Sequence, residues 1–411
     1  MFDEADKIIK TIIAENLPGK AVTDALKAHS FDKNIYMIAI GKAAWTMAEA
    51  AADFLGDKLK QGIVVTKYEH GMGRILNTEV YEAGHPVSDE NTIAATQKCV
   101  QLAQSLDEDD VLLFLISGGG SALFELPCDG ISLRDMQNVT EQLLSRGADI
   151  VEMNTVRKRL SKVKAGRFAK IAEPAQIFSI VLSDVLGDRL DTIASGPAAP
   201  DASTAVDAAK IVSKYRVQLT DVQKKYLTEE TPKKINNTKT IITGSVNTLC
   251  ESASKAAQAL GYAPVVLTSS LNCEAREAGR FLAAIACDIK AGKAFKTPSA
   301  VIAGGETVVT VRGTGKGGRN QELAFAAAKE ISGLDDVLIF SVGSDGTDGP
   351  TDAAGGMVNG QSLTKLKEAG MDFDKILADN DTYNGLNAMG GLVVTGPTGT
   401  NVNDVAVVLC K

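Results

Sequence analysis

Two glycine-rich loops with charged or hydroxyl neighbours follow apolar runs in the first half of the chain. Lys42 follows Gly41 and the apolar run 35–40, and the loop 117–121 reads Ser-Gly-Gly-Gly-Ser after the run 111–116. A lysine at the start of a helix attracts a phosphate or a carboxylate, and consecutive glycines let backbone N–H groups converge on an anion. The alternatives are a tight turn with a solvated lysine and a flexible loop. We predict an anion site formed by Gly41, Lys42, Ser117, Gly118, Gly119, Gly120 and Ser121.

A carboxylate stands beyond a third apolar run. Asp184 comes just after the run 177–182, which is where a general base or a magnesium ligand is expected. Asp188 is the weaker candidate, because an aspartate that follows a glycine in a turn is usually structural.

A third glycine-rich loop, residues 312–319, carries three cations. Its glycines at 313, 315 and 318 match the spacing of a dinucleotide-binding loop, but the acids at 335 and 336 precede the next strand instead of ending it. The dinucleotide interpretation therefore fails. The cations favour a polyphosphate or a carboxylate, and Arg319 at the start of a helix could bind such an anion at two points. Gly317, Gly318 and Arg319 are the predicted binding residues.

Three aspartates lie within eight residues at 345, 348 and 352. Asp345 and Asp348 could coordinate Mg²⁺ together with a bound nucleotide, and the alternative is a set of turns with solvated carboxylates. A last polar segment, 394–404, offers Thr, Asn and Gly for contacts to a polar ligand, or forms a plain turn.

Short apolar runs alternate with Ala-rich helical patterns along the whole chain, which predicts an α/β fold. We expect two α/β domains with mainly parallel, helix-covered sheets and a cleft between the domains. The polar segment 223–239 predicts the division, with a Rossmann-like domain over 1–235 and a second α/β domain over 236–411. Expected elements include a strand at 308–311 and a helix at 154–172, whose basic stretch 157–167 forms a face that is either solvated or adds positive field to the cleft.

Composition excludes several classes of protein. The 411 residues carry a net charge of -8, which argues against a nucleic-acid partner. The six cysteines and three histidines form no metal-binding spacing, and no apolar run is long enough to span a membrane. We expect a cytoplasmic protein with reduced thiols, monomeric or homodimeric. His70 and His85 are interpreted as loop and turn residues.

Taken together, the loops resemble the class II glycerate kinases, the family that carries the MOFRL domain. The motifs follow one another in the family's order: Gly41-Lys42-Ala-Ala, Val65-Thr-Lys-Tyr, Ala83-Gly-His-Pro, Ile116-Ser-Gly-Gly-Gly-Ser-Ala-Leu, Asn154-Thr-Val-Arg-Lys, Leu182-Ser-Asp-Val-Leu-Gly-Asp, Ala194-Ser-Gly-Pro, Gly304-Gly-Glu-Thr, Gly317-Gly-Arg-Asn-Gln-Glu-Leu, Ser344-Asp-Gly-Thr-Asp-Gly and Thr400-Asn-Val-Asn-Asp. The resemblance implies phosphorylation of D-glycerate by ATP with Mg²⁺, typically to 2-phosphoglycerate. It also implies Lys42, Asp184 and Arg319 as the charged active-site set, with Glu306, Asn320 and Asn401 among the substrate-binding residues.

Phosphoryl transfer needs positioning and charge neutralisation more than covalent chemistry, and these loops supply both. Asp184 would orient or deprotonate the 2-hydroxyl group, while Lys42 and Arg319 would neutralise phosphoryl and carboxylate charge. Two other functions stay open. A hydroxypyruvate reductase would need NAD(P)H, against which the failed dinucleotide loop argues, and a non-catalytic sensor of sugar acids would bind without turnover.

Overall fold

The computed structural model describes residues 1–185 and 187–411, which divide into two compact units. The first unit joins Met1–Leu17 to Gly244–Lys411, and the second is Pro18–Thr243. The sequence analysis placed the division at 235/236 and counted the first residues with the N-terminal half. Helix α1 (Phe2–Glu15) lies instead with the C-terminal half, because its apolar side, with Ile8 and Ile12 fully buried, packs against helix α11 (Val246–Ala259).

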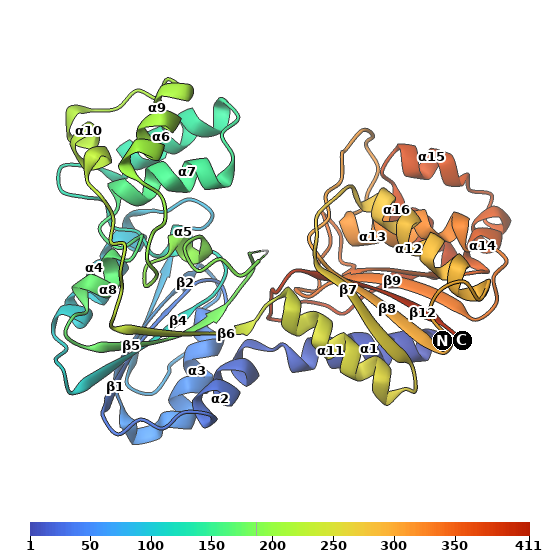
Figure 1. Ribbon diagram of the computed structural model, residues 1–411, viewed down its shortest axis with the longest axis horizontal. Coiled ribbons are helices and arrows are strands. Elements are labelled where there is room, and N and C mark those ends of the chain that lie inside the picture. The colour runs from blue at the N-terminus through green and yellow to red at the C-terminus, as the bar shows by residue number, and fades with distance from the viewer. Residues whose placement is uncertain (186) are drawn as a thin grey trace. The chain divides into compact units, whose positions relative to one another are not determined.

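The unit Pro18–Thr243 is built on a six-stranded sheet (Figure 1). Its strands are β1 (Asn34–Ile40), β2 (Leu59–Lys67), β3 (Thr78–Ala83), β4 (Asp110–Ile116), β5 (Gln176–Leu182) and β6 (Thr238–Gly244), in the order β3-β2-β1-β4-β5-β6. The first five are parallel. β1 and β4 read as continuous apolar runs because helices cover both faces of the sheet.

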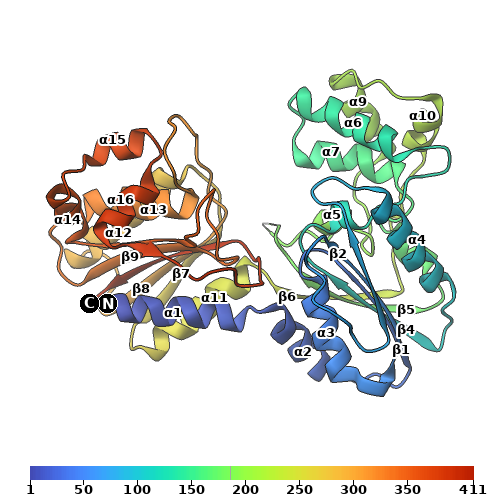
Figure 2. The same ribbon diagram turned by 180° about the vertical axis from the view of Figure 1, so that it is seen from behind.

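The covering helices of this sheet are α2 (Pro18–Lys27) and α3 (Ala44–Leu55) on one face and α4 (Glu90–Gln104) and α8 (Arg167–Ile171) on the other (Figures 1 and 2). Short helical turns lie at α5 (Gly120–Leu123), η1 (Gly56–Lys58) and η3 (Ile193–Ser195). Along each strand, alternate side chains enter opposite layers, so both layers are apolar.

A small helical cluster also belongs to this unit and was not predicted. It consists of α6 (Leu133–Ser145), α7 (Ile150–Arg157), α9 (Ala205–Lys214) and α10 (Asp221–Thr228) around an apolar core of its own.

The helix expected over 154–172 was wrong. α7 ends at Arg157, the short turn η2 (Lys158–Leu160) follows, and α8 begins only at Arg167. The basic stretch is not a solvated face either, because Arg159 is fully buried and donates to the carbonyl oxygens of Glu229 and Ser203 at 2.7 and 2.9 Å.

The other unit is built on a second six-stranded sheet, in the order β11-β10-β9-β12-β8-β7. Its strands are β7 (Ala263–Leu271), β8 (Ser299–Gly305), β9 (Val337–Gly343), β10 (Gly355–Asn359), β11 (Leu392–Val393) and β12 (Asp404–Cys410). The expected α/β fold is confirmed, but this sheet is mixed. β7 and β8 are parallel, whereas β12 runs antiparallel to β8 and β9, and β10 runs antiparallel to β9 and β11. The expectation of a mainly parallel sheet is therefore wrong for this unit. The predicted strand 308–311 is a loop, in which Val308 makes one isolated bridge to Glu274.

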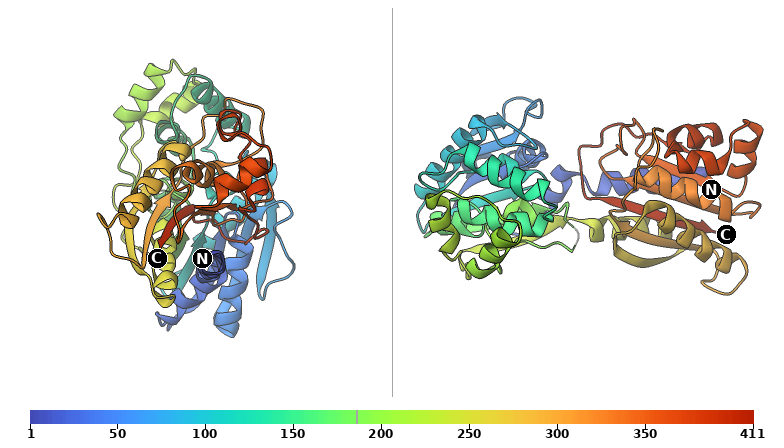
Figure 3. Two further views of the ribbon diagram at one scale, coloured as in Figure 1. Left: turned by 90° about the vertical axis from the view of Figure 1, so that its right-hand side faces the viewer. Right: turned by 90° about the horizontal axis from the view of Figure 1, so that it is seen from above.

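Helices α1 and α11 cover one face of this sheet (Figure 1). The other face carries α12 (Ala275–Lys290), α13 (Arg319–Glu330), α14 (Ser362–Glu368), α15 (Phe373–Ala378) and α16 (Thr382–Met389). The two chain ends lie side by side in this unit (Figure 3), where Lys411 Nζ is 2.8 Å from the Glu4 carboxylate. No helix among the described residues is long and apolar enough to cross a membrane.

Candidate active site

The first two predicted loops meet at the point where the order of the first sheet reverses. β2 and β3 lie on one side of β1, and β4 begins the other side, so the loops after β1 and β4 border the crevice in which open α/β sheets bind ligands. Gly41 has φ +114°, and a Cβ there would overlap Ser117 Oγ. Lys42 N donates to Gly118 O at 2.8 Å, and Ala43 N donates to Ser117 Oγ at 3.1 Å. These hydrogen bonds hold the loop after β1 and the loop after β4 against each other.

Three side chains that could take part in a reaction surround the triple glycine. A Cβ on Gly118 would overlap the carboxylate of Asp184, so this carboxylate lies directly against the backbone of the loop. Gly119 has φ +85°, and a Cβ there would be 3.2 Å from Lys42 Cγ and 3.0 Å from His85 Nε2. The structure thus brings Lys42 and Asp184 to the same loop. This agrees with the prediction, because both residues follow parallel strands that end at the same edge of the sheet.

His85 is a residue of this site that the sequence analysis interpreted only as a turn residue. Burial lowers the pKa of His85, and the nearby charge of Lys42 lowers it further, so the imidazole is neutral at pH 7. His70 also approaches, with Nδ1 3.1 Å from Lys42 O. The signal that could have found His85 is its position just beyond β3, whose carboxyl end meets the same edge of the sheet.

The 117–121 loop is held by its own backbone and by a buried lysine. Gly120 N donates to Ser117 O at 3.3 Å. Lys164, which is buried, donates from Nζ to Ser121 O at 2.9 Å and to Phe124 O at 2.7 Å. Burial lowers the pKa of this lysine to about 8. These contacts fix the position of the loop beside Lys42 and Asp184.

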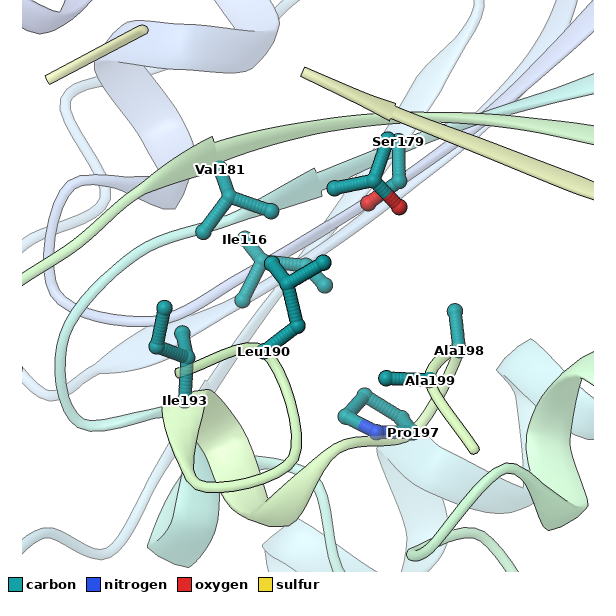
Figure 4. A pocket seen from close by; sticks show the side chains of 9 residues that line it. Ile116, Ser179, Val181, Leu190, Ile193, Pro197, Ala198 and Ala199 are labelled. Carbon is teal, nitrogen blue, oxygen red and sulfur yellow. The ribbon is translucent and has the colours of Figure 1, made fainter. Parts of the chain in front are cut away.

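A small cavity lies below this edge of the sheet (Figure 4), with about 10 Å³ of space. Ile116 and Leu190 line it, and Ser179 contributes a buried Oγ that has no partner in the described residues. The space suits about one water molecule, so we assign it no ligand.

Arg319, the predicted site residue of the other unit, is held by acids of its own chain. Its Nε and Nη2 donate to the two Asp404 oxygens at 2.5 and 3.1 Å, and Nη1 donates to Glu306 at 3.0 Å. Burial lowers the pKa of Arg319, but the hydrogen bond with Asp404 and the negative charges of Asp404 and Glu306 outweigh it, and the pKa is raised. The two-point contact that was expected for a substrate anion is thus made with Asp404.

In the glycine-rich loop before Arg319, backbone N–H groups also donate hydrogen bonds to carboxylates and an amide of the chain itself. Asn380 Oδ1 accepts from the N–H groups of Arg312 and Gly313 at 2.8 and 3.2 Å. Asp379 Oδ1 accepts from Thr314 N at 2.9 Å, and Asp381 Oδ1 accepts from Lys316 N at 3.0 Å. This arrangement argues against the predicted binding of a polyphosphate by these backbone groups.

Asp348 caps helix α13. Its two oxygens accept from Asn320 N at 3.1 Å and Gln321 N at 2.8 Å, and burial raises its pKa to about 6. Asp345 Oδ1 accepts from Thr347 N, and the described residues hold no group of three or more His, Cys, Asp or Glu side chains suited to a metal. A carboxylate that is already saturated by N–H donors does not fit Mg²⁺, so this pair does not make a prebuilt magnesium site.

The remaining predicted binding residues differ in accessibility. Asn320 is 1% exposed, and its Oδ1 accepts from Ser341 Oγ at 2.5 Å, which argues against direct contact with a substrate. Glu306 faces Arg319 and also accepts from Asn403 Nδ2 at 3.2 Å. Asn401 is partly exposed. The roles of these residues, and the shared cleft expected for Lys42 and Arg319, stay predictions.

Gly317 and Gly318 line a cavity of about 420 Å³ in the unit that carries Arg319. Arg319, Asp345 and Asp348 line it as well. The structure therefore offers two candidate regions, one in each unit: the loops after β1 and β4, and this cavity.

Comparison with known proteins identifies the class. A family model described as a domain of unknown function, DUF4147, matches residues 4–228, and the MOFRL family model matches residues 299–404. A D-glycerate 2-kinase of Thermotoga maritima is 50% identical over 98% of this chain and 97% of that protein. A putative hydroxypyruvate reductase of Agrobacterium vitis is 38% identical over 98% of this chain and 93% of that protein.

The same fold is found in a solved structure. The crystal structure of a glycerate kinase from Thermotoga maritima has a TM-score of 0.97 and 50% identity, covering 100% of this chain and 99% of that one. By its fold and its loops, the chain is an α/β protein of two units, with polar loops beyond the ends of the strands. The chain belongs to the glycerate kinase family with DUF4147 and MOFRL domains, which confirms the resemblance seen in the motifs.

Proposed function

We propose that this chain transfers the γ-phosphoryl group of ATP to the 2-hydroxyl group of D-glycerate, giving 2-phosphoglycerate and ADP. One observation carries the proposal: Lys42, the glycine-rich 117–121 loop and the Asp184 carboxylate meet at one edge of a parallel sheet. The 50% identity with a D-glycerate 2-kinase over nearly the whole chain supports the choice of reaction and substrate.

Asp184 is the group suited to handle the proton. The hydroxyl oxygen of glycerate attacks the γ-phosphorus, the bond to the bridging oxygen of ADP breaks, and the hydroxyl proton passes to the Asp184 carboxylate. Lys42 and the N–H groups of Gly118 and Gly119 hold the anion that lies beside this carboxylate, either the transferring phosphoryl group or the glycerate carboxylate.

Arg319 supplies positive charge in a fixed orientation. Asp404 accepts from Nε and Nη2 of its guanidinium, and Glu306 accepts from Nη1. A substrate anion would therefore meet the remaining N–H groups of Nη1 and Nη2. We propose that Arg319 contributes to charge neutralisation through this fixed edge, without the two-point contact first expected.

Magnesium enters this proposal with ATP. Because Asp348 is saturated by the N–H groups of helix α13, we assign the ion no prebuilt protein site and derive no step from it. A cytoplasmic location is part of the proposal, supported by six free cysteines, and the oligomeric state stays a prediction, monomer or homodimer.

The reductase named among the relatives is the competing activity. It would need a nicotinamide dinucleotide, and the loop with the matching glycine spacing follows no strand and has its N–H groups filled by Asp379, Asn380 and Asp381. These contacts favour the kinase.

The test incubates the purified chain with ATP, Mg²⁺ and D-glycerate and follows the product by ³¹P NMR. The expected result is a phosphomonoester coupled to the proton on C2 of glycerate. A parallel assay follows NADH absorbance with hydroxypyruvate. Oxidation of NADH without ADP formation would replace the kinase by the reductase, and binding of glycerate without either turnover would favour the sensor.

A further inference from the structure

The cavity in the MOFRL-containing unit is much larger than glycerate needs. Its volume of about 420 Å³ lies within the range of pockets that hold drug-sized ligands, about 300–1,000 Å³. Gly315, Pro350 and Asn380 are among the residues that line it. A small hydroxy acid would fill only a part of this space.

The charges around the cavity disfavour an anion. Glu322, Asp345 and Asp348 line it, and the one lining cation among the described residues, Arg319, is offset by Asp404 and Glu306. The backbone N–H groups of Thr314 and Lys316 in the neighbouring loop already donate to Asp379 and Asp381. Of the lining acids, Glu322 already accepts from Arg276 and Asn380, and Asp348 from the N–H groups of helix α13. Asp345 is partly exposed, and its carboxylate can accept hydrogen bonds from hydroxyl groups of a ligand.

Part of the cavity lining is apolar. Val309 and Val311, from the loop after β8, and Pro350 line it. Val311 is 74% exposed, so its side chain is accessible to a ligand. A flat heterocycle would cover this surface, while an attached diol would meet Asp345.

We propose that this cavity binds the nucleoside end of ATP, with the base against Val309, Val311 and Pro350 and the ribose hydroxyl groups toward Asp345. The phosphates lie outside the cavity, because its carboxylates repel them. The proposal rests on the proposed function, since it assigns the nucleoside of that reaction's phosphoryl donor to a place in the fold.

The test is Val311→Glu, with Val308→Glu as the matched control. Val308 is also exposed, at 52%, and does not line the cavity. Binding of ADP is measured by calorimetry on the full chain, and uncharged adenosine is used as a competitor. We expect Val311→Glu to raise the Kd for ADP at least about tenfold, equivalent to 1.4 kcal/mol, and Val308→Glu to change it less than about twofold.

Steady-state kinetics provide the second readout. The KM for ATP should rise in Val311→Glu while the KM for D-glycerate stays within about twofold of the wild type. An unchanged Kd for ADP, a rise confined to the KM for glycerate, or failure of adenosine to compete with ADP would each overturn the proposal. Thermal unfolding midpoints equal to wild type establish that both variants are folded.

The binding assay needs no turnover, so it separates the two proposals. ADP binding that weakens in Val311→Glu, in a chain that does not phosphorylate glycerate, would support the nucleoside site and reject the proposed function. Glycerate phosphorylation with an ATP affinity that Val311→Glu leaves intact would do the reverse.

Discussion

The two glycine-rich loops of this chain have similar compositions and different neighbours. Around the loop after β4, the side chains of Lys42, His85 and Asp184 lie against Gly118 and Gly119. In the loop before α13, Thr314 N and Lys316 N donate to Asp379 and Asp381. Both loops need glycine because another segment approaches closely. The first is approached by side chains that could act on a substrate, and the second by carboxylates that bind its own backbone. Glycine content alone therefore indicates close approach, and the neighbouring groups decide the function.

The comparison predicts that removal of charge at the first loop has the largest effect. Lys42→Ala should lower kcat by about 10³- to 10⁵-fold, because a cation that neutralises a transferring phosphoryl group contributes on this scale. The thermal midpoint should stay within about 2 °C of wild type. Coupled ADP-release kinetics measure the first quantity, and the control is Lys60→Ala, an exposed lysine on β2. Retention of more than a tenth of wild-type kcat would remove Lys42 from the site.

Replacement of the carboxylate beside Gly118 comes next. Asp184→Asn keeps the shape of the side chain and removes its capacity to accept a proton, so kcat should fall by about 10²- to 10⁴-fold across pH 6–9. Asp188→Asn is the comparison variant, because Asp188 stands in a turn with φ +52° in the same segment. If Asp188→Asn shows the larger loss and Asp184→Asn stays active, the base is Asp188.

A matched pair of glycine substitutions tests the contrast between the loops directly. In Gly119→Ala, the new Cβ would be 3.0 Å from the His85 ring in a backbone with φ +85°, so we expect a rise of about tenfold or more in KM with little change in yield of folded protein. In Gly315→Ala, the new Cβ would be 2.6 Å from Asp379 O, inside a packed contact. Its free energy of unfolding should fall by about 1–3 kcal/mol.

Urea denaturation and initial-rate kinetics on both variants give the result. The contrast fails if Gly315→Ala lowers kcat without losing stability, because its loop would then act on phosphoryl transfer itself. It also fails if Gly119→Ala loses stability alone.

The smallest predicted effect concerns pH. Burial raises the pKa of Asp348 to about 6, above its ordinary value of 3.8, so the folded chain retains a proton that the unfolded chain releases. The stabilisation from this proton is complete below about pH 4 and is lost as the pH rises through about 6, an effect of at most about 3 kcal/mol. Asp348→Asn should flatten this part of the stability profile measured by urea denaturation. Asp374→Asn, a surface carboxylate, should leave it unchanged.

Local pattern was enough to predict which loops of the unit Pro18–Thr243 lie together. Parallel strands end at one edge of their sheet, so polar residues such as Lys42, Ser117 and Asp184, each just beyond an apolar run, had to lie near one another. His85 was not predicted as a site residue because β3, the strand before it, is only partly buried and lacks a strong apolar pattern. The strand predicted at 308–311 has the right residues, but its backbone groups find few partners in the sheet.

The unit that carries Arg319 depended on contacts between distant segments. Arg319 lies at the start of a helix, as predicted, yet its partner Asp404 is 85 residues away. The side chains that accept from the loop at 312–316 come from residues 379–381. The two strands that make the sheet mixed, β10 and β12, run antiparallel to their neighbours.

The sequence by itself determined the alternation of strands and helices and the family, because these follow from the order of residues within short segments. Only the tertiary structure decided which groups surround each glycine-rich loop. Every residue except proline carries the same N–H group, and whether a distant carboxylate accepts from that group depends on what the fold brings to it. In this chain Asp379 and Asp381 accept from the loop at 312–316, whereas Lys42, His85 and Asp184 surround the loop at 117–121.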